Sequence, residues 1–110
     1  MDPHRLGEER SLALHRVIAS RLRVDPAIRL RARDRIARWV GAGTLHREHA
    51  DLWLAVLDGP IEALEALLVD PTDEARTLRS VTPFAGEIEP RERWRIWREV
   101  RARLESSDAT

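Results

Sequence analysis

Apolar residues recur along most of this chain at intervals of three and four positions, the spacing of one face of an α-helix. The pattern predicts helices over about residues 8–23, 26–40, 45–58, 60–69, 71–79 and 90–105. No stretch alternates apolar and polar residues for long enough to form a strand. The sequence therefore predicts an all-α fold: a compact bundle of five to six short helices, one domain over residues 1–110 with ends that fray at 1–10 and 106–110.

Each predicted helix has one apolar face that we expect to lie in the core. The expected core positions are Leu14, Val17, Ile18, Leu22, Ile28, Ala32, Ile36, Trp39, Val40, Ala50, Trp53, Leu54, Leu57, Ile61, Leu64, Leu67, Leu68, Val100 and Leu104. Trp94 and Trp97 share the face of the last helix, and two interpretations stay open for them. Tryptophan at helical spacing is usually core, but a pair near a chain end is also where interface anchors occur.

Prolines mark the predicted helix starts. A proline is favoured at the first helical position, where its missing N–H would have no partner anyway. This device marks four starts, at Pro26, Pro60, Pro71 and Pro90. We expect Asp25 and Asp70 to cap two of these helices, and residues 41–43 (GAG) to end one helix before Thr44 caps the next.

Composition limits the setting in which the chain works. It has no cysteine, so disulfides and thiolate metal sites are excluded. No apolar run of about 18 residues is present to cross a membrane, and the first ten residues lack the apolar stretch of a secretory signal. We expect a cytoplasmic bacterial protein.

A formal net charge of zero conceals a division of charge along the chain. Residues 1–40 carry ten arginines against five acidic residues, residues 41–75 carry one against eight, and residues 76–110 carry eight against six. Three interpretations stay open: the segments neutralise each other by packing, the charges are ordinary solvated helix faces, or the chain docks onto a partner of opposite charge.

Motifs for catalysis and metal binding are incomplete. His46 and His49 are three apart, whereas the zinc-protease signature needs two histidines four apart with glutamate beside the first. Residues 41–44 (GAGT) resemble a phosphate-binding loop only superficially, because the chain has no lysine. We therefore expect neither an enzyme nor a site for a metal or cofactor.

Arginines on the second predicted helix are the clearest candidates for contact with a charged partner. Arg31, Arg35 and Arg38 form one stripe that could neutralise phosphates. A helix-turn-helix drawn over residues 26–57 fails chemically, because its recognition helix would carry Glu48 and Asp51. Non-specific contact with nucleic acid, or docking to an acidic protein, stays open.

The most distinctive stretch is DEARTLRSVTPFAG at residues 73–86, followed by PRERW at 90–94. It resembles a recurring segment of small bacterial toxin–antitoxin-type proteins, which are free-standing or follow a helix-turn-helix regulator domain. The likeness covers about residues 11–104. Thr82 stands where serine is expected, and the regulator domain is missing, which puts direct operator binding in doubt.

The resemblance implies an antitoxin-like protein that neutralises a cognate toxin, either a nucleotidyltransferase-like protein or a ribonuclease, by binding it. Physically, Pro83, Phe84, Gly86 and Pro90 form a turn that inserts Phe84 into the core and fixes the angle between the fifth and last helices. The residues expected to contact the partner are arginines and tryptophans, the types that dominate interface energetics: Arg31, Arg35, Arg38, Arg91, Trp94, Arg95 and Trp97.

Two alternatives accompany this hypothesis. The first is a nucleic-acid-associated or transcriptional accessory protein that uses the arginine-rich N-terminal helices. The second is a homo-oligomer in which the acidic centre of one chain meets the basic helices of another.

Overall fold

The computed structural model describes residues 2–108 and has an all-α fold, as the sequence predicts. The helices are α1 (Pro3–Arg21), α2 (Ala27–Gly41), α3 (Arg47–Asp58), α4 (Ile61–Val69), α5 (Asp73–Arg79) and α6 (Pro90–Asp108), with a single 3₁₀ turn, η1 (Ala85–Glu87), between the last two. No helix among the described residues is long and apolar enough to span a membrane.

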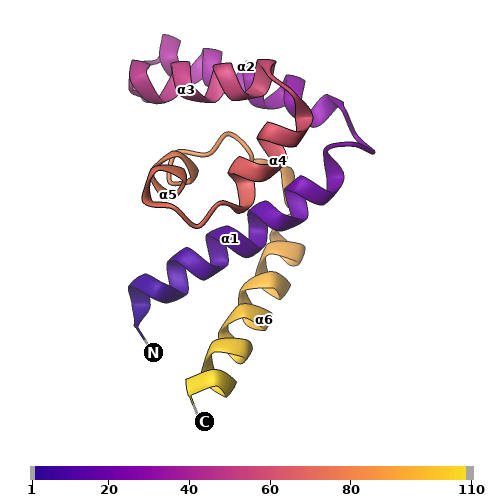
Figure 1. The fold of residues 1–110 in the computed structure, drawn as a ribbon, viewed down its shortest axis with the longest axis vertical. Coiled ribbons are helices and arrows are strands. Elements are labelled where there is room, and N and C mark those ends of the chain that lie inside the picture. Colours follow the sequence, from indigo (N-terminus) through magenta and orange to yellow (C-terminus); the bar gives the residue numbers. More distant parts are fainter. Residues whose placement is uncertain (1, 109–110) are drawn as a thin grey trace.

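Helix α1 forms the centre of the arrangement (Figure 1). It packs most extensively against α4 and α6, while α2 and α3 pack against each other at the end of the molecule far from both termini. The loop that contains η1 crosses from α5 to the start of α6, so residues far apart in the sequence meet around the first half of α1.

The prolines mark helix starts less directly than the sequence suggests. Pro90 is the first residue of α6, whereas Pro26 and Pro60 occupy the cap positions of α2 and α4 and Pro71 precedes α5. A fifth proline, Pro3, is the first residue of α1. A start marked by proline is therefore correct to within one or two residues, the usual uncertainty of a helix boundary.

The predicted capping residues are wrong in three places. Asp25 makes no cap, because its carboxylate accepts a hydrogen bond from Arg31 instead. Thr72 caps α5 in place of Asp70, accepting from the Ala75 N–H at 3.3 Å.

At α3 the cap is His46, whose Nδ1 accepts from the Glu48 N–H at 3.3 Å. Thr44, the expected cap, donates its hydroxyl to the Trp39 carbonyl at 3.2 Å. The glycine turn does end α2: Gly43 adopts φ 72°, and its N–H donates to the Val40 carbonyl while that of Thr44 donates to Trp39, as in a Schellman cap.

Both ends at which fraying is expected, 1–10 and 106–110, are helical where the structure describes them: α1 begins at Pro3 and α6 ends at Asp108. Met1, Ala109 and Thr110 lie outside the described range, and the expected fraying stays a prediction. Three contacts account for the order of α1. The Asp2 side chain caps it by accepting from the His4 N–H at 3.0 Å, Leu6 packs against the core, and Glu9 pairs with Arg103 of α6 at 3.3 Å.

The core contains the predicted apolar faces of α1 to α4, but the face of α6 differs from the prediction. Ile96, which the prediction omitted, is buried with Val100 and Leu104 at intervals of four residues. Trp94 points away and is 58% exposed. The two tryptophans of α6 therefore have different positions. Trp94 is a surface residue, whereas Trp97 is half-buried against the core.

Candidate functional site

The segment from Thr82 to Gly86 lies in the connection between α5 and α6, with its middle buried and Gly86 exposed. Pro83 and Phe84 are buried, and the Phe84 ring meets the Trp53 ring edge to face with centroids 5.7 Å apart. The Trp53 indole N–H in turn donates to the Leu78 carbonyl at 3.1 Å. As the sequence predicts, Phe84 is inserted into the core, and Pro90 begins α6 only a few residues later.

A directed set of hydrogen bonds ties this segment to α1. Nδ1 of His15 lies 2.7 Å from the Ser11 carbonyl, an acceptor, so Nδ1 carries the proton. Nε2 then accepts from the Thr82 hydroxyl at 2.8 Å, and the same hydroxyl oxygen accepts from the Phe84 N–H at 3.1 Å. Burial lowers the pKa of His15 to about 4, and the positive charge of Arg79 adds to this shift. His15 is therefore neutral at pH 7.

Glu87 attaches the same loop to α2 through two of the predicted partner-binding arginines. Its carboxylate, only 8% exposed, lies 2.7 Å from Arg31 and 2.7 Å from Arg35. Hydrogen bonds from Arg31 are the main reason that the pKa of Glu87 lies below its usual value. Arg35 also donates to the Pro83 carbonyl at 2.9 Å, and a Cβ added at Gly86 would lie 3.7 Å from its guanidinium, in ordinary contact.

Other arginines between positions 10 and 38 also form ion pairs or hydrogen bonds within the chain. Arg23 pairs with Glu65 at 2.8 Å, Arg21 pairs with Glu92, and Arg33 pairs with Asp58. Arg29 donates to the Leu57 and Gly59 carbonyls. Much of the charge division is thus neutralised by packing. In the described part of the chain, Arg16 and Arg38 are exposed and make no ion pair or hydrogen bond.

The outer face of α6 brings together three of the remaining predicted contact residues. Arg91, Trp94 and Arg95 are all exposed there; Arg95 lies 3.4 Å from Glu92, and Arg91 has no such partner among the described residues. Trp97 does not belong to this face. Its ring packs against the core, with the guanidinium carbons of Arg10 and Arg93 at 5.7 and 5.6 Å from its centroid.

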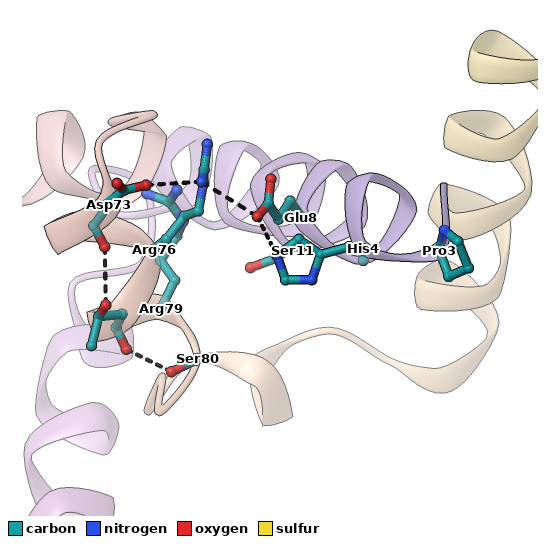
Figure 2. Close-up of a pocket in the computed structure, with 10 residues that line it drawn as sticks. Pro3, His4, Glu8, Ser11, Asp73, Arg76, Arg79 and Ser80 are labelled. Carbon is teal, nitrogen blue, oxygen red and sulfur yellow. Dashed lines mark hydrogen bonds and ion pairs between the residues drawn. The ribbon is translucent and has the colours of Figure 1, made fainter. Parts of the chain in front are cut away.

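Two grooves flank the first half of α1, and Trp97 is the one predicted partner-contact residue in their printed lining. Figure 2 shows the larger, about 650 Å³, between α1 and α5, where Arg76 pairs with Glu8 at 3.4 Å and Asp73 at 2.9 Å. The smaller, about 270 Å³, lies between α1, the Thr82–Ala85 loop and Trp97. Gly7, Ser11 and Arg79 line both, so the grooves are continuous.

The only sequence signal for these grooves is Gly7, a glycine inside α1 with no structural need for one. Its φ is not positive, and a Cβ added there would meet nothing within 4 Å.

The two histidines near the start of α3 have their ring centroids 6.0 Å apart. Among the described residues, no three histidines or acidic residues are grouped to hold a metal ion.

Comparisons with known proteins add no relative: no family model, no curated protein and no solved structure matches this chain.

Proposed function

We propose that this chain is an antitoxin-like binding protein that neutralises a cognate toxin by direct contact, a nucleotidyltransferase-like protein or a ribonuclease being the expected partner. The observation that supports this most is the exposed tryptophan of α6. Trp94 is 58% exposed although the chain has only four tryptophans and one phenylalanine to build its core. An exposed indole offers a partner a large apolar contact that few other residue types can supply.

The neighbours of Trp94 have the chemistry of an interface. Arg91 and Arg95 are exposed on the same helix and face solvent with it. Tryptophan and arginine are the residue types most enriched among binding hot spots, because they combine a large apolar contact with hydrogen-bond donors. The partner is expected to offer a pocket for the indole ring with carboxylates at its rim.

The test is co-expression with the product of the neighbouring gene. Wild-type chain should rescue growth and co-purify with that product, Trp94→Ala should lose both, and Leu52→Ala should retain both. Leu52 is a matched control because it is 53% exposed but lies on α3. Absence of rescue and co-purification by the wild-type chain would overturn the antitoxin proposal, whereas full rescue by Trp94→Ala would exclude this face of α6.

Fewer arginines are available for the nucleic-acid alternative than the sequence suggests. Arg16 and Arg38 are exposed without ion pairs among the described residues, but the other predicted phosphate contacts, Arg31 and Arg35, are held by Glu87. Phosphate binding weakens linearly with the logarithm of salt concentration, with a slope set by the number of contacts. A gel-shift series that shows no retardation even at low salt removes this alternative.

A further inference from the structure

Three arginines around the smaller groove lack the acidic partners that other arginines of this chain have. Arg10, Arg79 and Arg93 come from α1, α5 and α6, and each is half-buried or buried. Within the described residues, none of the three lies within ion-pair distance of a carboxylate. The larger groove differs in this respect, because its Arg76 is bound by Glu8 and Asp73 (Figure 2).

Arg10 is the member of this group that makes no hydrogen bond to the described chain. Its guanidinium stacks over Trp97, and its Nε is buried without an acceptor among the described residues. Its two terminal nitrogens make no hydrogen bond to the described chain either, so all five N–H groups of this guanidinium lack an acceptor among the described residues.

Arg93 and Arg79 reinforce the positive charge at this place. The Arg93 Nη2 donates to the Ala85 carbonyl at 2.6 Å, while its Nε is also buried without an acceptor. The Arg79 Nη1 donates to the Leu67 carbonyl at 3.0 Å, and this side chain is only 4% exposed. Arg10 and Arg79 thus line the groove, and Arg93 lies beside it against Trp97 and Ala85. Of the three, Arg79 also feels the negative charge of Asp70, so Arg10 is the one best placed to bind a ligand.

We propose that the smaller groove is a binding site for an oxyanion, a carboxylate or a phosphate group, held by Arg10 and packed beside Trp97. A guanidinium presents paired N–H donors that match the two oxygens of either group. Reduced contact with water strengthens the attraction beyond that of an exposed arginine. The groove volume of about 270 Å³ lies just below the range of drug-sized ligand sites, so it fits one such group with a small apolar attachment.

Gly7 provides the access to this site. It lines the groove, and the absence of any atom within 4 Å of an added Cβ shows that a larger side chain would project into open space. Gly7→Leu should therefore obstruct the groove without altering any of the three arginines, and it places a good helix former in α1.

The experiment uses NMR of the uniformly ¹⁵N-labelled chain and follows the arginine Nε–Hε signals. Inorganic phosphate and, separately, acetate are added at an ionic strength held constant with sodium chloride. Because the Nε atoms of Arg10 and Arg93 are shielded from water, their protons should exchange slowly enough to be observed. We expect saturable shifts of both signals with a midpoint of about 1–10 mM, and no shift at Arg23, whose Nε is bound by Glu65.

Three variants identify the site. Arg10→Met and Gly7→Leu should abolish the saturable shift, while Arg16→Met, an exposed arginine of the same helix, should leave it unchanged. If Arg10→Met fails to fold by circular dichroism, Gly7→Leu alone decides. Tighter binding of phosphate indicates a phosphate-bearing ligand, and tighter binding of acetate indicates an acidic side chain or chain terminus. No saturable shift with either anion, or an equal shift in Gly7→Leu, overturns the proposal, and neither result depends on the toxin experiment.

Discussion

His15 and Thr82 join two distant parts of the chain through one buried pair of side chains. The imidazole is 1% exposed, and both ring nitrogens are hydrogen-bonded, Nδ1 as donor to Ser11 and Nε2 as acceptor from Thr82. Protonation would reverse the bond to Thr82, because Nε2–H would then donate to the hydroxyl oxygen. The cost of protonation comes instead from placing a positive charge in a buried site near Arg79. A serine at position 82 would supply the same hydroxyl.

Burial of His15 makes the free energy of unfolding depend on pH. The unfolded chain binds a proton at His15 below a pKa of about 6.5, but the folded chain binds it only below about 4. Protonation therefore favours the unfolded state, and we expect the free energy of unfolding to fall by about 3 kcal/mol between pH 6.5 and 4. Urea denaturation across this range measures it. His15→Gln should show a much weaker dependence between pH 6.5 and 5, and His4→Gln, an exposed histidine, should behave as wild type.

At the scale of the helices, some buried faces can be predicted from the local sequence pattern, whereas others depend on tertiary packing. The buried faces of α1 to α4 follow from spacing alone, because periodicity is a property of each segment by itself. The face of α6 does not, since Trp94, Ile96 and Trp97 are all apolar and only packing decides that Ile96 is buried and Trp94 is exposed. Proline predicts where a helix starts, but which nearby polar side chain caps it depends on geometry that the sequence does not reveal.

The candidate site was least accessible to sequence analysis for the same reason. The pairing of Arg31 and Arg35 with Glu87 joins residues about fifty positions apart, and a charge stripe on a helix does not indicate whether its partner is internal. Arg10, Arg79 and Arg93 come from three separate helices, so no local motif unites them. Phe84 was predictable because one aromatic residue in a proline–glycine turn has no favourable place except the core.

The two helix-associated glycines should respond in opposite ways to alanine. Gly7 lies inside α1 with space around it, so Gly7→Ala should raise the free energy of unfolding by about 0.5–1 kcal/mol. Gly43 adopts φ 72°, a left-handed conformation that ends α2, so Gly43→Ala should lower it by about 1 kcal/mol. Thermal and urea denaturation of both variants test this, and destabilisation by Gly7→Ala would contradict the space found at that position.

The two nearby tryptophans of α6 should differ in the same measurement. Trp97 packs against the core and between arginines, so Trp97→Ala should cost about 1–3 kcal/mol, less than a fully buried tryptophan. Trp94→Ala should change the free energy of unfolding by less than about 0.5 kcal/mol. This difference makes Trp94 the proper probe of partner binding, because a loss of binding in Trp97→Ala would be confounded by a loss of fold. Equal costs at both positions would show that Trp94 is also structural.

At the scale of the whole molecule, the division of charge is largely resolved within one chain. Arg23 and Arg33 of the basic N-terminal part pair with Glu65 and Asp58 of the acidic middle. These pairs occupy groups that the homo-oligomer hypothesis would require for contact between chains. Since most of the paired side chains are partly exposed, each contributes little to stability individually, but together they neutralise part of the charge of the basic and acidic segments within one chain.

The chain is therefore expected to remain a monomer whatever the salt concentration. Attraction between the basic and acidic parts of different chains would be strongest at about 0.01 M salt, where the Debye length is about 30 Å, and would vanish at about 1 M, where it is about 3 Å. Sedimentation equilibrium should give 12.7 kDa at both concentrations. A dimer present only at low salt would show that the segments pair between chains. Arg33→Glu, which reverses the charge at position 33 and so places it against the like charge of Asp58, would then dissociate this dimer.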